Sequence, residues 1–182
     1  RAASEVGRVI GEISQKTGVV NTVVRHDDGT LSGYNTDGIG ALGAIGEVQG
    51  AVCLVVGAGG AARAIIHALL GAGARKVLVM NRSLSGAMSL CDIFIESPVH
   101  VYQAESLEEM DILIQATPEA VKIPLDLELE GLRKGTRVLE TIMRPTTLSE
   151  KAHSLGMEVI PGHAMLYHQT MKNFELLTGI PV

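Results

Sequence analysis

The chain has 182 residues, 46% of them apolar and only 3% aromatic, which suits one domain, or one domain with a fragment of a second, built on an aliphatic core. A net charge of −5 without a lysine or arginine cluster argues against nucleic acid as the main partner. No apolar run is long enough to span a bilayer and no signal peptide is recognisable, so a cytoplasmic protein with no membrane contact is expected.

The first part of the chain indicates a helix followed by a hairpin. Residues 3–16 are compatible with a helix, although two glycines weaken the pattern. An apolar, β-branched run at 19–24 precedes the tight-turn signal "DDGT" at 27–30, and "LSGYN" at 31–35 can return as a second strand. A short helical stretch is then expected from residue 37 to about residue 47.

From residue 51 onward, apolar strands alternate with helical stretches. Strands without polar alternation are expected where both faces of a sheet are covered, and this rhythm is typical of parallel βαβ units. The predicted fold is α/β, a doubly wound, Rossmann-like parallel sheet, preceded by a remnant of a smaller α/β domain. The expected strands cover 51–56, 76–80, 99–102, 111–116, 136–141 and 157–160. The expected helices cover 60–72, 84–95 and 147–155, weaker stretches at 106–110 and 125–133, and a long final helix from Gly162 to Gly179.

The segment "GAGGAA" follows the first of these strands and opens an alanine-rich helix. It places Gly57, Gly59 and Ala62 in the G-x-G-x-x-G/A pattern of dinucleotide-binding turns. Gly57 permits a sharp turn, Gly59 has no side chain to keep a pyrophosphate away, and Ala62 lets the helix pack closely on the sheet. The helix N-terminus then offers unpaired N–H groups to the phosphates. The alternative is a glycine-rich turn that binds no ligand.

The end of the second strand indicates which dinucleotide is bound. NAD sites usually carry an acidic residue there, but this chain reads "VLVMNRS", with Asn81, Arg82 and Ser83. A carboxylate would repel a 2′-phosphate, whereas Arg82 can bind one with its planar guanidinium. The segment therefore favours NADP. The alternative is that Arg82 is a solvated residue at the start of a helix.

The segment "GYNTDGIG" at residues 33–40 places one carboxylate, Asp37, between glycines and small polar residues. Asp37 can be an N-cap of the following helix, or it can face a ligand cleft. The residues alone leave both interpretations open.

Together these motifs, with "GVVNTVV" before them and the closing "GHAMLYHQ" and "FELLTG", resemble the shikimate 5-dehydrogenase family (shikimate/quinate dehydrogenase) from about Val19 to the end. The resemblance implies reversible, NADP-dependent reduction of 3-dehydroshikimate to shikimate in aromatic amino acid biosynthesis. It implies that Asp37 is the catalytic carboxylate and binds substrate together with Asn21 and Gln169. The cofactor-binding residues it implies are Gly57, Ala58, Gly59, Gly60, Ala61, Asn81, Arg82, Ser83, Thr141, Gly162 and Met165.

The resemblance also implies a division of the chain. Residues 1–37 would be a remnant of the substrate-binding domain, 38–161 the dinucleotide-binding domain, and 162–182 a C-terminal helix that returns to the cleft. Family members pair the catalytic aspartate with a lysine from the first domain, and no residue here matches that motif. A chain that starts with Arg and lacks the lysine indicates a piece of a longer gene product, inactive by itself. Its partner would be a small-molecule substrate, and a homodimer is left open.

Two segments depart from the family pattern. Where the family has a tyrosine in "D-x-x-Y-x-P", this chain reads "ETIMRP" with Met143, and where it has "NAT" this chain reads "QAT" followed by Glu119. Loss of the tyrosine leaves a quinate or related dehydrogenase open, as well as an oxidoreductase for another ketone. A ligand-sensing module without catalysis is a further alternative.

No metal site is predicted. His163 and His168 lie on the last helix without an acidic or cysteine partner, so surface positions are expected for them. Cys53 and Cys91 are isolated, which favours two reduced core thiols.

Overall fold

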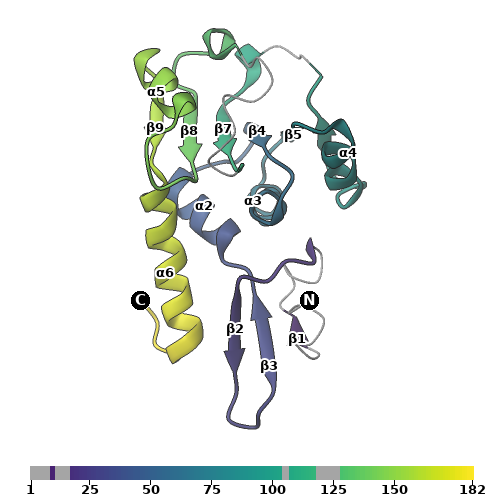
Figure 1. Ribbon diagram of the computed structural model, residues 1–182, viewed down its shortest axis with the longest axis vertical. Coiled ribbons are helices and arrows are strands. Elements are labelled where there is room, and N and C mark those ends of the chain that lie inside the picture. The colour runs from purple at the N-terminus through teal and green to yellow at the C-terminus, as the bar shows by residue number, and fades with distance from the viewer. Residues whose placement is uncertain (1–8, 11–16, 104–106, 118–127) are drawn as a thin grey trace.

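A computed structural model describes residues 9–10, 17–103, 107–117 and 128–182 and contains two sheets (Figure 1). The larger sheet has six parallel strands in the order β6-β5-β4-β7-β8-β9. From β4 the chain runs outward to β6, returns to β7 beside β4, and continues to β9, so the order reverses between β4 and β7. This is the predicted doubly wound fold. The strands are β4 (Val52–Val56), β5 (Lys76–Met80), β6 (Val99–Val101), β7 (Ile112–Gln115), β8 (Arg137–Glu140) and β9 (Glu158–Ile160).

Helices cover both faces of this sheet. One core cluster joins alternate strand residues such as Cys53 and Val55 to α2, α3 and α6, and the other joins Leu54 and Val56 to the opposite layer. The central strands β4, β5 and β7 are largely apolar because both of their faces are buried. The helices are α2 (Asp37–Ile45), α3 (Gly60–Gly71), α4 (Leu84–Asp92), α5 (Thr147–Ser154) and α6 (Gly162–Thr178), with short 3₁₀ turns η2 (Leu107–Glu109) and η4 (Leu129–Gly131).

The smaller sheet consists of β1 (Val9–Ile10), β3 (Leu31–Tyr34) and β2 (Thr22–Arg25), in that order. The β2–β3 hairpin is the one expected from "DDGT": Asp28 accepts hydrogen bonds from the backbone and hydroxyl of Thr30, and Gly29 has a φ of 84°. In Figure 1 the arrowheads of β7 and β8 point toward the half of the molecule where this hairpin and α6 lie. The carboxyl ends of the large sheet therefore face the small one.

Four predicted helical stretches differ from the structure. Residues 9 and 10 form a strand that pairs in parallel with β3, so a continuous helix over 3–16 is wrong at these positions; the rest of that stretch lies outside the described residues. Of 106–110 and 125–133, the described parts hold only the turns η2 and η4, because both segments are short links between strands. The helix expected over 84–95 ends at residue 92.

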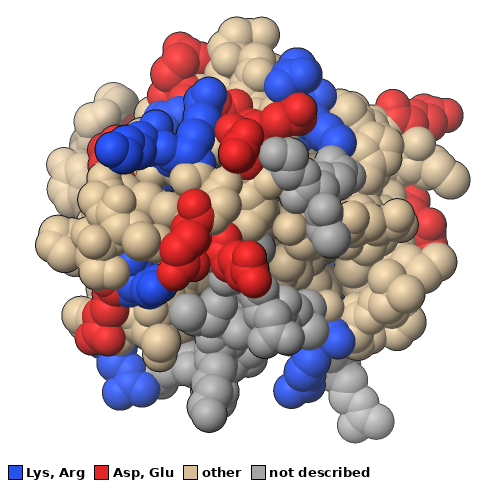
Figure 2. All heavy atoms as spheres, turned by 90° about the horizontal axis from the view of Figure 1, so that it is seen from above, with Lys and Arg blue, Asp and Glu red and all other residues tan. Residues whose placement is uncertain are grey.

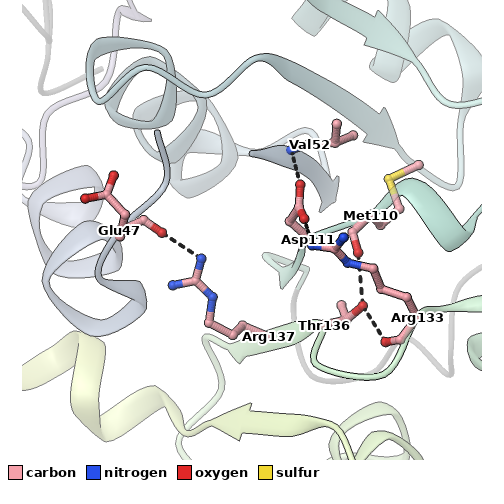
Figure 3. A network of polar contacts seen from close by, with 7 residues as sticks. All are labelled: Glu47, Val52, Met110, Asp111, Arg133, Thr136 and Arg137. Carbon is pink, nitrogen blue, oxygen red and sulfur yellow. Dashed lines mark hydrogen bonds and ion pairs between the residues drawn. The ribbon is translucent and has the colours of Figure 1, made fainter. Parts of the chain in front are cut away.

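The amino-terminal edge of the sheet ties α2 to β8 (Figure 3). The Arg137 guanidinium donates to the carbonyls of Ile45 and Glu47, both at 2.6 Å, and so binds the C-terminal end of α2. Asp111 accepts from the Val52 amide at 2.7 Å and pairs with Arg133. The Arg137 contacts hold one end of α2 against β8, which matters because the other end of α2 carries Asp37.

The surface seen from above Figure 1 has acidic and basic side chains close together (Figure 2). Within the described ranges, no helix is both long and apolar enough to cross a membrane. Cys53 lies in the core, where burial raises the pKa of its thiol to about 12, whereas Cys91 on α4 is only partly buried. The prediction of two core thiols therefore holds for Cys53 alone.

Candidate active site

Asp37 is the first residue of α2, directly after β3. The preceding Thr36 occupies the N-cap position without a side-chain cap, and the Asp37 amide donates to Asn35 Oδ1 at 2.9 Å. Asn35 forms this local turn because its short side chain reaches the amide two residues on. The N-cap interpretation of Asp37 is therefore wrong, and its carboxylate is available for other contacts.

The Asp37 carboxylate brings together the three predicted substrate residues. Its Oδ1 accepts from Asn21 Nδ2 at 2.9 Å and from Gln169 Nε2 at 2.6 Å. Asn21 immediately precedes β2 and Gln169 lies on α6, so three separate parts of the chain meet at one oxygen. Asp37 is half-buried and Asn21 exposed, which places the cluster at the surface rather than in the core.

A second set of contacts orients the Asn21 amide. Its Oδ1 accepts from the Thr36 backbone N–H at 3.1 Å and from the Thr22 hydroxyl at 2.9 Å. With the oxygen held by these donors, the NH₂ group is turned toward Asp37. An amide donor beside a carboxylate suits a site that binds a polyhydroxylated molecule.

The predicted phosphate-binding turn lies between β4 and α3. Gly57 has a φ of 120°, and a Cβ there would come within 2.7 Å of the Ala116 carbonyl at the end of β7, so only glycine fits. The space a Gly59 side chain would occupy is open. Ala62 is fully buried against the sheet, as expected from its place in the motif. The first N–H groups of α3 thus follow a turn in which no side chain stands at Gly59 to keep a phosphate away.

Unpartnered polar atoms next to this turn fit a dinucleotide. The Thr117 hydroxyl and Arg63 Nε are buried and have no hydrogen-bond partner among the described residues. Thr117 lies close to the turn, with its Cγ2 3.2 Å from where a Gly57 Cβ would be. A bound phosphate or ribose could accept or donate the missing hydrogen bonds. The residues present therefore fit the predicted cofactor.

The three residues after β5 have different environments. Asn81 Nδ2 donates to the Ser83 carbonyl at 3.0 Å, and the Ser83 hydroxyl accepts from the Gly86 amide at 3.0 Å as the N-cap of α4. These two side chains build the turn. Arg82 projects from the turn and is exposed, which leaves its guanidinium accessible to a phosphate.

The loop after β8 is held by a buried carboxyl group. Glu140 Oε1 accepts from the Ile142 amide at 3.1 Å, and the Thr146 hydroxyl donates to Oε2. Burial raises the pKa of Glu140. Glu140 therefore ties both ends of the loop that contains Met143, which is exposed and stands where the resemblance leads us to expect a tyrosine. A cavity of about 510 Å³ beside this loop is lined by Met143, Arg144, Pro145, His153, Val159 and His163, among others.

The remaining predicted cofactor residues lie near the carboxyl ends of β7 and β8 or at the start of α6. The Thr141 amide donates to the Gln115 carbonyl at 3.2 Å. Gly162 begins α6 in a position where a Cβ would come within 2.5 Å of the Ile142 carbonyl. Met165 is only 5% exposed and packs in the core cluster that also contains residues of α2 and α3.

The histidines of α6 form no metal site in the part of the chain that the structure describes. His163 is exposed, as expected, whereas His168 is half-buried and packs against Gly43 of α2. Glu119 lies outside the described residues.

Sequence reasoning missed Thr22, Asn173 and Thr117. Thr22 Oγ1 contacts Asn173 Oδ1 at 2.8 Å and so connects β2 to α6. Asn173 follows Gln169 by one helical turn, and that spacing was the one available signal for it. Thr22 and Asn173 are 151 residues apart in the sequence. No sequence motif indicates that one hydroxyl and one amide so far apart will form a contact.

Comparisons with known proteins show the family of the chain. The family model described as "Shikimate / quinate 5-dehydrogenase" matches residues 41–144. A shikimate dehydrogenase (NADP(+)) from Sphingopyxis alaskensis is 38% identical over 94% of the chain, and the chain spans 65% of that relative's length.

Solved structures of related enzymes share the fold of this chain. The shikimate dehydrogenase of Thermus thermophilus, solved with shikimate, is 32% identical with a TM-score of 0.83, and the match covers 99% of this chain and 69% of its own. The 5-ketofructose reductase of Gluconobacter sp. strain CHM43 is 29% identical with a TM-score of 0.86, and the match covers 100% of this chain and 70% of its own. From the family model, the sequence identity and the shared fold, the chain belongs to the shikimate/quinate 5-dehydrogenase family.

Proposed function

We propose that the protein containing this chain is an NADP-dependent shikimate dehydrogenase, which interconverts 3-dehydroshikimate and shikimate. The observation that carries the proposal is the meeting of Asn21 and Gln169 at the Asp37 carboxylate, on the side of the molecule toward which the carboxyl ends of the sheet point. The relatives' names, which specify NADP(+) and shikimate, support the same choice.

The chain's own residues have separate tasks in this reaction. NADPH, when bound, supplies the hydride. Gly57, Gly59 and the N-terminus of α3 hold the pyrophosphate, and Arg82 binds the 2′-phosphate. Asn21 and Gln169 contact the substrate hydroxyl and carboxylate groups.

Asp37 takes part in proton transfer together with the family's catalytic lysine, whose motif no residue of this chain matches. The two amide donors of the described site both reach Oδ1, which leaves Oδ2 to face a substrate hydroxyl or the lysine ammonium. Negative charge develops on the carbonyl oxygen during hydride transfer, so an acid must be held at that oxygen, and a carboxylate beside a lysine orients it there. We also propose the division into residues 1–37, 38–161 and 162–182 for these tasks.

Shikimate-dependent reduction of NADP by the full-length protein tests the function. Turnover that falls by orders of magnitude in Asp37→Asn, with NADP affinity nearly unchanged, is the expected result. Equal loss of NADP binding would make Asp37 a structural residue. Absence of turnover with demonstrated NADP binding would contradict the dehydrogenase and favour a sensing module.

One observation favours a second candidate, a dehydrogenase for quinate or another related hydroxy compound. Met143 stands where the family's substrate-contacting tyrosine is expected, and its thioether cannot replace a phenol as a hydrogen-bond donor. Parallel assays with quinate, and with NAD in place of NADP, separate these candidates by the ratio of kcat/KM. The cytoplasmic location and the homodimer stay predictions.

A further inference from the structure

A row of polar contacts connects α6 to Asp37 by way of β2. The Thr22 hydroxyl lies 2.8 Å from Asn173 Oδ1 and 2.9 Å from Asn21 Oδ1. Asn173 lies one turn beyond Gln169 on the same side of α6. The helix therefore reaches the Asp37 carboxylate twice, directly through Gln169 and indirectly through Thr22 and Asn21.

The single proton of the Thr22 hydroxyl determines the direction of the hydrogen bonds in this row. A hydroxyl has one proton and donates to only one of the two amide oxygens at a time. A 180° turn of the Asn173 amide exchanges Oδ1 for Nδ2, which then donates to Thr22 Oγ1. The Thr22 proton is in that case committed to Asn21 Oδ1, and every group in the row has a complementary partner.

The orientation of Asn21 matters to the site. Reversal of its amide would place Oδ1 against the Asp37 carboxylate, where two acceptors repel, and the NH₂ group against the Thr36 N–H, where two donors meet. Thr36 and Thr22 both oppose this reversal because both donate to Oδ1. With the Asn173 amide turned so that Nδ2 donates to Thr22 Oγ1, Asn173 directs the Thr22 proton to Asn21 Oδ1.

We propose that Asn173 is a positioning residue for the candidate active site: through Thr22 it holds the Asn21 amide in the orientation that donates to Asp37. Its kinetic consequences rest on the proposed function. Hydrogen bonds connect Asn173 to Asp37 through the side chains of Thr22 and Asn21.

A double-mutant cycle with Asn173→Ala and Thr22→Val in the full-length protein tests the proposal. Each single change is expected to raise the KM for shikimate roughly five-fold, as for the loss of one hydrogen bond, without changing the KM for NADP. The double variant should be no worse than the poorer single one, because both break the same row. The proposal would be overturned if the increases in the KM for shikimate added in the double variant. It would also be overturned if the single variants kept the wild-type KM.

Three further variants sharpen the cycle. Thr22→Ser keeps the hydroxyl and should retain most of the wild-type KM. Asn173→Asp can only accept a hydrogen bond, so it should draw the Thr22 proton away and impair shikimate binding at least as much as Asn173→Ala. Thr170→Ala removes an exposed polar side chain from the same helix and serves as the matched control.

A measurement without turnover separates this proposal from the proposed function. The side-chain NH₂ resonances of Asn21 in the NMR spectrum should shift and exchange faster with water in Asn173→Ala, but not in Thr170→Ala. Unchanged Asn21 resonances would overturn the positioning role, whatever substrate the protein uses. Changed resonances in a protein that does not oxidise shikimate would contradict only the proposed function.

Discussion

At the scale of single residues, Arg82 offers the clearest test of cofactor choice. Its exposed guanidinium is proposed to bind the 2′-phosphate that distinguishes NADP from NAD. Arg82→Ala should raise the KM for NADP by roughly ten-fold or more, the usual effect of losing a charge-assisted hydrogen bond, and should leave NAD nearly unaffected. Steady-state kinetics with both cofactors measure this.

The control for Arg82 is Arg75→Ala, an exposed arginine near the opposite end of β5. A cofactor preference that stays the same in Arg82→Ala would contradict the phosphate-binding role. A change of preference in Arg75→Ala would point to a general effect of net charge.

Glu140 makes a prediction about pH. Because burial raises the pKa of this carboxyl, the folded protein binds the proton more tightly than the unfolded chain does. Stability from this group is thus present at low pH and decreases as pH rises from the ordinary glutamate range through the raised pKa. Glu140→Gln should remove that decrease.

Urea unfolding of wild type and Glu140→Gln across this pH range measures the difference. The variant should gain stability relative to wild type as pH rises, whereas Glu158→Gln, which changes an exposed carboxyl on β9, should not. Parallel pH profiles for wild type and Glu140→Gln would show that Glu140 carries no such linkage.

At the scale of elements, the packing of α2 against α6 depends on Gly40. A Cβ at this position would lie 2.3 Å from Gln169 Cγ and 2.8 Å from the Met165 carbonyl. Gly40→Ala should therefore displace Gln169 from Asp37 and raise the KM for shikimate, with a loss of about 1–3 kcal/mol in the free energy of unfolding.

Gly43→Ala is the matched control on the same helix. Its added methyl group meets the His168 ring rather than Gln169. The KM for shikimate should stay near the wild-type value even if stability falls. Similar KM values for the two alanine variants would mean that Gly40 affects only packing.

Arg137 anchors the other end of α2. It makes two charge-assisted hydrogen bonds of 2.6 Å, a part-buried one to the carbonyl of Ile45, the last residue of α2, and an exposed one to that of Glu47. Arg137→Ala should therefore lower the free energy of unfolding by roughly 2 kcal/mol. Arg133→Ala breaks an ion pair with a largely exposed arginine and should cost less than about 1 kcal/mol. Urea unfolding of the two variants measures the loss of stability in each. Equal losses would contradict the anchoring role of Arg137.

The strands of the large sheet were predictable because their pattern is local. Residues such as Val55 and Leu78 lie in runs that are buried on both faces, and glycine at 57 is required by the turn that follows β4. The short turns η2 and η4 were not predictable as such, since their conformation depends on contacts with the rest of the fold more than on their own few residues.

At the scale of the whole molecule, the family motifs identified Asp37, Asn21 and Gln169, but not the contacts that hold them. No period or spacing shows that Thr22 meets Asn173, because the contact depends on how α6 lies beside β2. The role of Asp37 was equally undecided from the residues alone, because its motif suits both an N-cap and a carboxylate that faces a ligand. In the structure Thr36 is the N-cap, and the Asp37 amide donates to Asn35 Oδ1.

The same long-range contacts have a consequence for the order of folding. Asp37 and Gln169 are 132 residues apart and Thr22 and Asn173 are 151 apart, whereas β4 and β5 pair across one helix. Contacts between distant residues carry the larger loop-closure entropy and form slowly. During synthesis, the first half of the sheet can pair long before Gln169 leaves the ribosome. The carboxylate site should therefore be completed last, on a sheet that has already formed.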